Sequence, residues 1–316
     1  MSVGSRPIVP SRLAPGGVIS HGSRRQPTSV LGGYVALMKL RVVELLLITT
    51  VPTMVLAEQG WPSWSLVGVT LLGGTLAAGG ANAINMVVDR DIDALMERTR
   101  TRPLVTGLIS PRAALVFAVA LEVAAFGVLW SGANLLSALL ALSATLFYVF
   151  VYTLWLKRTS RQNIVIGGAA GAVPVLVGWA AVQDSLAWEP VVLFVAIFLW
   201  TPPHFWALAI RHADEYRAAQ VPMLPAVAPM DQTIRQMVVY SVALTASTLI
   251  LVPVADSGPI YWVTAVLFGG GFILSVVNLG RDPSARRSMR VFALSITYVT
   301  VLFVALAVDV LVRKGI

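Results

Sequence analysis

Three polar side chains recur every four positions at the end of an otherwise apolar segment: Asn85, Asp89 and Asp93. On a helix, this spacing places them on one face, about 6 Å of axial rise apart. Two carboxylates and an amide oxygen form a ligand set for Mg²⁺, which takes its remaining ligands from water and substrate phosphates. The alternative interpretation is a helix end whose acids pair with arginines of the adjoining loop, namely Arg90, Arg98, Arg100 and Arg102.

The loop that follows is rich in arginine, with Arg98, Arg100 and Arg102 preceding Pro103. A guanidinium binds phosphate oxygens through two parallel hydrogen bonds. Acids followed directly by arginines therefore suit a diphosphate with its metal better than a free metal. A basic loop at the inner membrane face, neutralised by its acids, is the other interpretation.

A second acidic site, Asp214 and Glu215, follows the first by about 125 residues and lies between Arg211 and Arg217. Both sites end apolar segments of the same predicted orientation. They suggest a duplicated half, with the two helix ends facing a shared cavity. A solvated loop with ordinary ion pairs would give the same local pattern.

Four further cations are predicted at the same membrane face. Lys157 and Arg158 could hold a leaving diphosphate or act as membrane anchors, and Lys39 and Arg41 could point into the same site or extend to the interface.

The segment Trp200-Thr-Pro-Pro-His-Phe-Trp206 contains two consecutive prolines, which predict an interruption of its helix. The imidazole of His204 could ligate a haem iron, bind a substrate, act as a base or be a satisfied core histidine.

Glu44, Glu122 and Asp309 lie within apolar segments, where carboxylates are costly and are candidate pocket or partner sites. The glycine-rich runs 73–80 and 167–171 predict close helix packing.

These residues must be positioned by membrane helices. The 316 residues are 57% hydrophobic and 12% charged, and their mean hydropathy is +0.80. A soluble domain cannot bury so much apolar surface, whereas segments of about 20 apolar residues span a bilayer. We predict an all-α polytopic membrane protein, with one domain at 34–316 after a disordered cytoplasmic tail at 1–33. About nine spans are expected, at 34–57, 64–88, 112–131, 134–155, 163–182, 187–209, 233–254, 258–279 and 291–312.

The net charge of +8 reflects topology and not nucleic-acid binding. Lys and Arg concentrate in the N-terminal segment and in alternate loops, which are therefore predicted to be cytoplasmic: 89–111, 156–162, 210–232 and 280–290. The absence of cysteine excludes disulfides and thiolate chemistry. We expect a bacterial plasma membrane. The acid-free residues 1–33 also resemble an organelle transit peptide, so the mitochondrial inner membrane is the alternative if this segment is cleaved.

Together these motifs resemble the UbiA superfamily of intramembrane prenyltransferases and, within it, the protohaem IX farnesyltransferase family. The superfamily mark is Asn85-x3-Asp89-x3-Asp93 with an acidic second site. The closer mark includes Met96-x-Arg98-Thr99-x2-Arg102-Pro103, Leu156-Lys157-Arg158, Thr201-Pro-Pro-His204-Phe-Trp206 and Val221-Pro-Met-Leu-Pro225. The chain departs from that pattern at Leu40, Val175, Glu215 and Gln220, where proline, proline, aspartate and glycine are usual.

The resemblance implies a UbiA-type helical bundle around a central cavity that opens at the cytoplasmic face. It also implies farnesyl transfer from farnesyl diphosphate to a vinyl group of haem b, giving haem O. Mg²⁺ would be bound by Asn85, Asp89 and Asp93, with a second ion at Asp214 and Glu215. The diphosphate would be held by Lys39, Arg41, Arg98, Arg102, Lys157 and Arg158. His204 and Trp206 are hypothetical haem contacts, and a downstream haem-modifying enzyme is a possible partner.

Two alternatives remain at the level of sequence. One is a prenyltransferase of the same fold that acts on a quinone precursor or another aromatic acceptor; the long motifs around His204 and Val221 argue against it. The other is a transporter with charges at the midplane and broken helices. Its weakness is that the polar residues gather at one membrane face.

Overall fold

The computed structural model describes residues 29–316, apart from the side chains of residues 41, 42 and 45–47. In that part of the chain every regular element is a helix. The elements are α1 (Val30–Leu37), α2 (Leu40–Glu58), α3 (Trp64–Val88), α4 (Arg90–Leu95), α5 (Pro111–Gly132), α6 (Leu135–Leu146), the π-helix η1 (Phe147–Leu156), α7 (Lys157–Thr159), α8 (Asn163–Gln183), α9 (Trp188–Arg211), α10 (Ala213–Ala218), α11 (Leu224–Val227), α12 (Met230–Val254), α13 (Pro259–Arg281) and α14 (Ala285–Lys314).

Within the described residues, eight helices are long and apolar enough to cross a bilayer, which is close to the predicted nine. Seven of them are single elements, and the eighth, Leu135–Thr159, combines α6, η1 and α7. The predicted span 34–57 is not one helix, because Lys39 adopts a left-handed conformation (φ 51°) that separates α1 from α2. The first of the nine predicted spans is therefore bent at its basic end.

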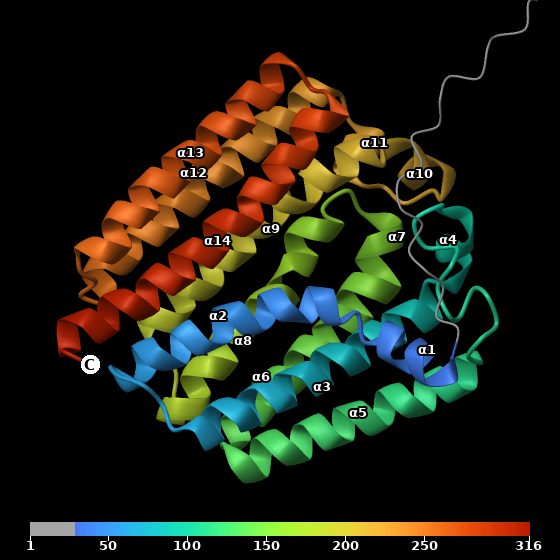
Figure 1. Ribbon diagram of the computed structural model, residues 1–316. Helices are drawn as coiled ribbons and strands as arrows, with labels where there is room; N and C mark the ends of the chain where they lie inside the picture. Colours follow the sequence, from blue (N-terminus) through green and yellow to red (C-terminus); the bar gives the residue numbers. More distant parts are fainter. Residues whose placement is uncertain (1–28) are drawn as a thin grey trace, which may run out of the picture.

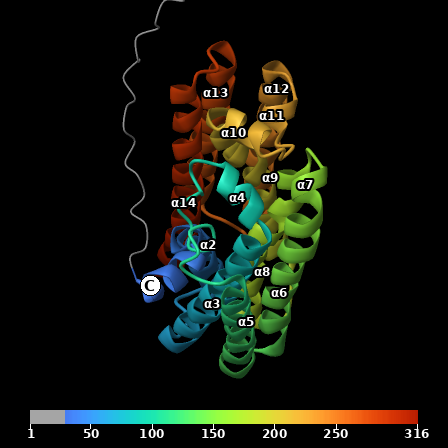
Figure 2. The ribbon, with the colours of Figure 1, turned by 90° about the vertical axis from the view of Figure 1, so that its right-hand side faces the viewer.

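The long helices form a bundle with two halves (Figure 1). In the N-terminal half α3 packs against α5, and in the C-terminal half α9 packs against α8 and α12. The short helices α4, α7, α10 and α11 lie at one end of the bundle, and the C-terminus lies at the other. Figure 2 looks onto this end and places α4 and α10 in front of the long helices. The predicted cytoplasmic loops are thus brought to one face.

Local sequence signals explain several helix starts. The hydroxyls of Ser63 and Ser110 accept backbone hydrogen bonds at the starts of α3 and α5, and Asn134 does the same for α6. Pro111 occupies the first turn of α5, where its missing N–H costs no helical hydrogen bond. These caps satisfy backbone donors that the helix itself leaves unpaired.

The prediction that Pro202 and Pro203 interrupt their helix is wrong, because α9 runs without a break from Trp188 to Arg211. Both prolines are buried, and α9 is packed by α8, α12 and α14. Such packing supports a membrane helix across prolines.

Glycine allows close approach at several predicted positions, of which Gly80 and Gly167 are examples. A Cβ atom at Gly80 would lie 3.0 Å from the Ala118 carbonyl oxygen of α5, and one at Gly167 would lie 2.4 Å from the Tyr152 ring. The prediction is wrong at Gly171, where no atom lies within 4 Å of such a Cβ.

The three carboxylates within apolar segments have different surroundings. Asp309 of α14 is 1% exposed and accepts hydrogen bonds from the Gly258 and Tyr261 N–H groups at the start of α13. Glu122 of α5 accepts a hydrogen bond from Thr145, and Glu44 is exposed. Asp309 is therefore a helix cap and not a pocket residue.

Candidate active site at the α3–α4 junction

The Asn85–Asp89–Asp93 motif spans a break between two helices. Helix α3 ends at Val88, Asp89 is the junction residue (φ −86°, ψ 7°), and α4 begins at the next residue. The helical hydrogen bonds continue across the break, from Asp89 N to Asn85 O at 2.9 Å and from Asp93 N to Asp89 O at 2.8 Å. The three residues are at most 3% exposed. The predicted shared face is therefore kept, although the helix is not continuous.

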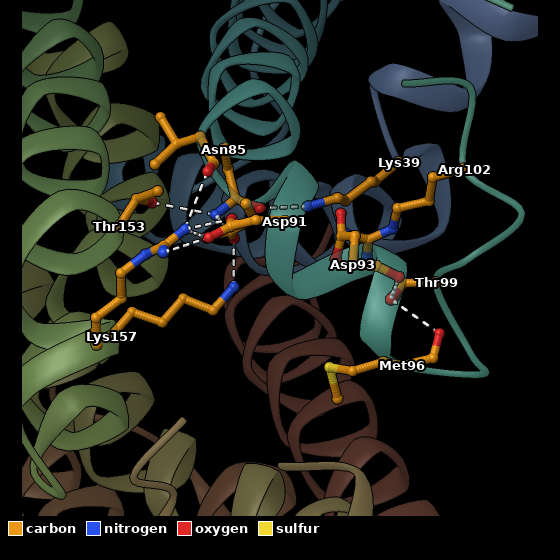
Figure 3. A network of polar contacts seen from close by, with 12 residues as sticks. Lys39, Asn85, Asp91, Asp93, Met96, Thr99, Arg102, Thr153 and Lys157 are labelled. Carbon is orange, nitrogen blue, oxygen red and sulfur yellow. Dashed lines mark hydrogen bonds and ion pairs between the residues drawn. The ribbon is translucent and has the colours of Figure 1, made fainter. Parts of the chain in front are cut away.

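Cations from two other segments contact the first half of the motif (Figure 3). Lys157 forms an ion pair with the Asp89 carboxylate, and Lys39 Nζ donates to Asn85 Oδ1 at 2.8 Å. The Asn85 amide donates to Asp89 Oδ2 at 2.7 Å and to the Thr153 hydroxyl at 3.2 Å. Asn85 is therefore hydrogen-bonded both to Lys39 and to the Asp89 carboxylate, which pairs with Lys157.

The loop after α4 folds back onto Asp93. Arg102 Nη1 donates to Asp93 Oδ2 at 2.5 Å, and Thr99 Oγ1 donates to the Asp93 carbonyl oxygen at 2.9 Å. Successive turns hold this loop, with hydrogen bonds from Thr99 N to Met96 O and from Arg102 N to Thr99 O. The basic loop thereby contacts the last acid of the motif, Asp93.

The second acidic site has the same local construction as the first. Helix α9 ends at Arg211, His212 is a junction residue, and the six-residue α10 carries acids in its first turn, as α4 does. Only one of these two acids contacts the loop that follows the first motif. Glu215 Oε2 lies 3.5 Å from Arg98 N, whereas the Asp214 side chain is 98% exposed and pairs with Arg217.

Arg158 contacts an acid that the motif does not include. Its Nη1 and Nη2 atoms donate to the two carboxylate oxygens of Asp91, both at 2.7 Å, and Nη2 donates to the Val88 carbonyl oxygen at 3.0 Å. This fork lowers the pKa of Asp91 to about 2. Asp91 is therefore ionised at neutral pH.

Two buried polar atoms fit a metal and its phosphate ligand. Asp89 Oδ1 and Arg98 Nε are buried and have no hydrogen-bond partner. A free carboxylate oxygen is a ligand for Mg²⁺, and a free guanidinium N–H is a donor to phosphate. No group of three His, Cys, Asp or Glu side chains in the described part of the chain could hold a metal, so a site here needs Asn85 or substrate oxygens.

The two predicted haem contacts lie in the core of the C-terminal half. His204 is stacked between Trp200 of α9 and Phe292 of α14, and its Nδ1 lies 2.7 Å from Ser295 Oγ. Trp206 is fully buried in the same core. The structure does not join them to the polar residues of the α3–α4 junction. Arg41, another predicted site residue, has its side chain outside the described residues.

Sequence reasoning missed several residues of the cluster. Thr153 precedes Lys157 by four positions, a spacing that could have indicated a shared face. Asp91 and His212 flank the predicted acids, and His212 Nδ1 lies 2.7 Å from Glu215 Oε1.

Tyr148 and Tyr152 stack on each other within η1, with centroids 5.3 Å apart. No local sequence signal predicted this π-helix, and such segments occur frequently at functional sites.

The chain was compared with known proteins. The UbiA prenyltransferase family profile matches residues 46–306. A protein from Frankia alni named protoheme IX farnesyltransferase is 55% identical over 288 residues, covering 88% of this chain and 98% of that protein.

Solved structures share the fold at low identity. A digeranylgeranylglyceryl phosphate synthase structure has a TM-score of 0.74 at 16% identity, covering 89% of this chain and 98% of that one. A UbiA homologue from Archaeoglobus fulgidus bound to GPP and Mg²⁺ has a TM-score of 0.63 at 17% identity, covering 87% and 99%. The helical bundle and the family match lead to one conclusion: this chain belongs to the UbiA prenyltransferase family.

Proposed function

We propose that this chain transfers the farnesyl group of farnesyl diphosphate to a vinyl group of haem b, giving haem O. The observation that carries the proposal is the buried cluster at the α3–α4 junction. Asp89 Oδ1 of this cluster is buried without a hydrogen-bond partner, and so is Arg98 Nε in the loop after α4. The acceptor is inferred from the similarity to the Frankia alni protein, which extends over nearly the whole of that relative.

The carboxylates of the cluster suit Mg²⁺ bound to a diphosphate. Asp89 and Asp93 would hold one ion with Asn85, and Glu215 would contribute to a second. Bound Mg²⁺ supplies charge neutralisation at the diphosphate oxygens. Asp214 points to solvent and pairs with Arg217, so its assignment as a metal ligand remains a prediction.

The cations of the cluster would stabilise the leaving group. As the bond between C1 and oxygen breaks, negative charge develops on the diphosphate, and fixed donors that face this charge lower the barrier. We assign this role to Lys39, Arg102 and Lys157, which contact the motif, and to Arg98 in the loop after α4. Arg41 remains a further candidate. The vinyl group of haem b attacks the allylic carbon, and addition of water completes the hydroxyethylfarnesyl chain.

The membrane placement is part of the proposal. The cluster would lie at the cytoplasmic face of the plasma membrane, since the basic loops share that end of the bundle (Figure 1). The mitochondrial inner membrane is the alternative location. A downstream haem-modifying enzyme would take up the apolar product from the bilayer. Contacts from His204 and Trp206 to haem remain a hypothesis drawn from the sequence.

The first test is the conversion of haem b to haem O by membranes that carry the protein, with farnesyl diphosphate and Mg²⁺. The product is identified by chromatography and mass, and chelation of Mg²⁺ is expected to abolish it. A folded protein that leaves haem b unchanged but prenylates a phenolic acceptor would overturn the acceptor assignment. A protein that uses neither acceptor would overturn the proposal.

The orientation can be tested with single cysteines, because the sequence contains none. The two variants are Glu97→Cys and Glu58→Cys. Glu97 lies in the loop after α4, Glu58 lies at the end of α2, and both are exposed. In intact cells, an impermeant maleimide should label position 58 and not position 97. The reverse pattern would place the cluster at the outer face.

A further inference from the structure

Arg158 holds the two helices of the motif together at their junction. Its guanidinium contacts the carbonyl oxygen of Val88, the last residue of α3, and both carboxylate oxygens of Asp91 in the first turn of α4. Nη2 also lies 3.9 Å from Asp89 Oδ1 at the junction itself. One side chain from a third segment, α7, therefore contacts every part of the break.

This arrangement depends on the shape of the guanidinium. Two parallel hydrogen bonds to one carboxylate require a planar fork, and the same Nη2 atom reaches the Val88 carbonyl oxygen as well. An ammonium group carries the same charge but cannot reproduce this geometry. The contact therefore selects arginine over lysine.

The two successive cations of α7 are hydrogen-bonded to different carboxylates. Lys157 pairs with the buried Asp89 of the motif, whereas Arg158 is engaged by Asp91, which the motif does not include. Nη1 and Nη2 both donate to Asp91, and Nη2 also donates to the Val88 carbonyl oxygen, so Arg158 is directed at the helix break.

We propose that Asp91 and Arg158 form a positioning pair that fixes the angle between α3 and α4, and thus the separation of Asp89 and Asp93. This inference rests on the proposed function, and it replaces the predicted role of Arg158 in binding diphosphate. The pair acts through the two acids and does not touch substrate. Because the Arg158 fork engages both carboxylate oxygens of Asp91, the junction is set before any ligand binds.

The exposure of the pair gives the proposal a distinctive signature. The side chains of Arg158 and Asp91 are 36% and 65% exposed. Exposed ion pairs contribute little to stability, so loss of this one should leave the thermal midpoint nearly unchanged. A displaced catalytic group, in contrast, can reduce a rate by roughly 100-fold for a shift of about 1 Å. We therefore expect a loss of kcat without a loss of stability.

The deciding variants are Asp91→Asn and Arg158→Lys in the full-length protein, with Glu97→Gln as a matched control. Glu97 lies just after α4 and forms an exposed ion pair with Arg100 at 3.6 Å, without any contact to the break. For haem O formation, both test variants should lower kcat by roughly 10- to 100-fold. Their KM for farnesyl diphosphate should stay within about twofold, and the control should match the wild type.

A second readout needs neither metal nor substrate. Amide hydrogen exchange of residues 90–95 should become faster in both test variants and should stay unchanged in Glu97→Gln, since only the test variants release α4. If Asp91→Asn keeps full activity and wild-type exchange, the proposal is overturned. It is also overturned if Arg158→Lys raises KM while Asp91→Asn has no effect, because Arg158 would then bind the diphosphate. Absence of haem O from the wild type would instead overturn the proposed function, and the exchange experiment would still decide on the pair.

Discussion

Lys39 and Asn85 are 46 residues apart in sequence and are joined by a hydrogen bond of 2.8 Å from the ammonium group to the amide oxygen. Lys39 occupies the left-handed bend between α1 and α2, so the bend directs this cation at the end of α3. The Asn85 amide nitrogen in turn donates to Asp89. The bend in the first predicted span therefore has a clear structural consequence: it supplies a cation to the motif.

We predict that Lys39→Met raises KM for farnesyl diphosphate by roughly 10- to 100-fold, because hydrogen bonds to charged groups contribute about 1.5–3 kcal/mol. Steady-state haem O formation measures this. Lys314→Met is the matched control, since Lys314 is exposed near the C-terminus at the opposite end of the bundle. Equal KM values for the two variants would exclude Lys39 from the site.

Asp89→Asn should abolish activity and also destabilise the protein. The change removes the carboxylate that pairs with Lys157, whose side chain is only 16% exposed. Loss of one partner from a buried ion pair costs about 3–5 kcal/mol. The double variant Asp89→Asn/Lys157→Met should recover much of the stability in thermal unfolding and none of the activity. Recovery of activity would show that Asp89 has only a structural role.

Asp309→Asn should lower the free energy of unfolding by about 1–3 kcal/mol, because it weakens a buried group that accepts two backbone hydrogen bonds and pairs with Arg313. Asp256→Asn is the control. Asp256 pairs with the same Arg313 at 3.4 Å but is fully exposed, so its loss should change little. Equal unfolding midpoints in detergent for the two variants would contradict the capping role of Asp309.

Gln220→Gly should stabilise the protein by roughly 0.5–1 kcal/mol. Gln220 has φ 53°, a left-handed conformation that costs a residue with a side chain about 1–2 kcal/mol, while glycine loses more entropy on folding. This conformation favours glycine, the residue that the family resemblance predicts at this position. The thermal midpoint measures the effect, and a lower midpoint in the variant would refute this account of the turn.

The pKa of Asp91 provides a prediction for pH. The Arg158 fork lowers this pKa to about 2, below the value of about 3.9 in an unfolded chain. The pair's contribution to the free energy of unfolding is therefore complete above about pH 4. It is lost as the pH falls towards about 2. In a carbon NMR titration, the Arg158→Gln variant should show an Asp91 carboxyl pKa of about 3.9. An unchanged titration would show that Arg158 does not interact with Asp91 in solution.

Local patterns predicted most of the helices, because a membrane helix is specified by its own run of apolar residues. They failed where a non-local contact decides the backbone. Lys39 bends the first span, and Pro202 and Pro203 remain inside α9 because its neighbours pack around them. The glycine-rich run after Tyr152 predicted close packing correctly at Gly167 and not at Gly171.

The sequence by itself determined the acidic motif, the cations near it and the apolar segments that carry them, since each is a local pattern. Only the tertiary structure decided the partners of these charges. It directed Lys157 to Asp89, Arg158 to Asp91 and Asp214 to solvent. The physical reason is that an ion pair depends on the distance between side chains from separate helices, and this distance is set by how the helices pack.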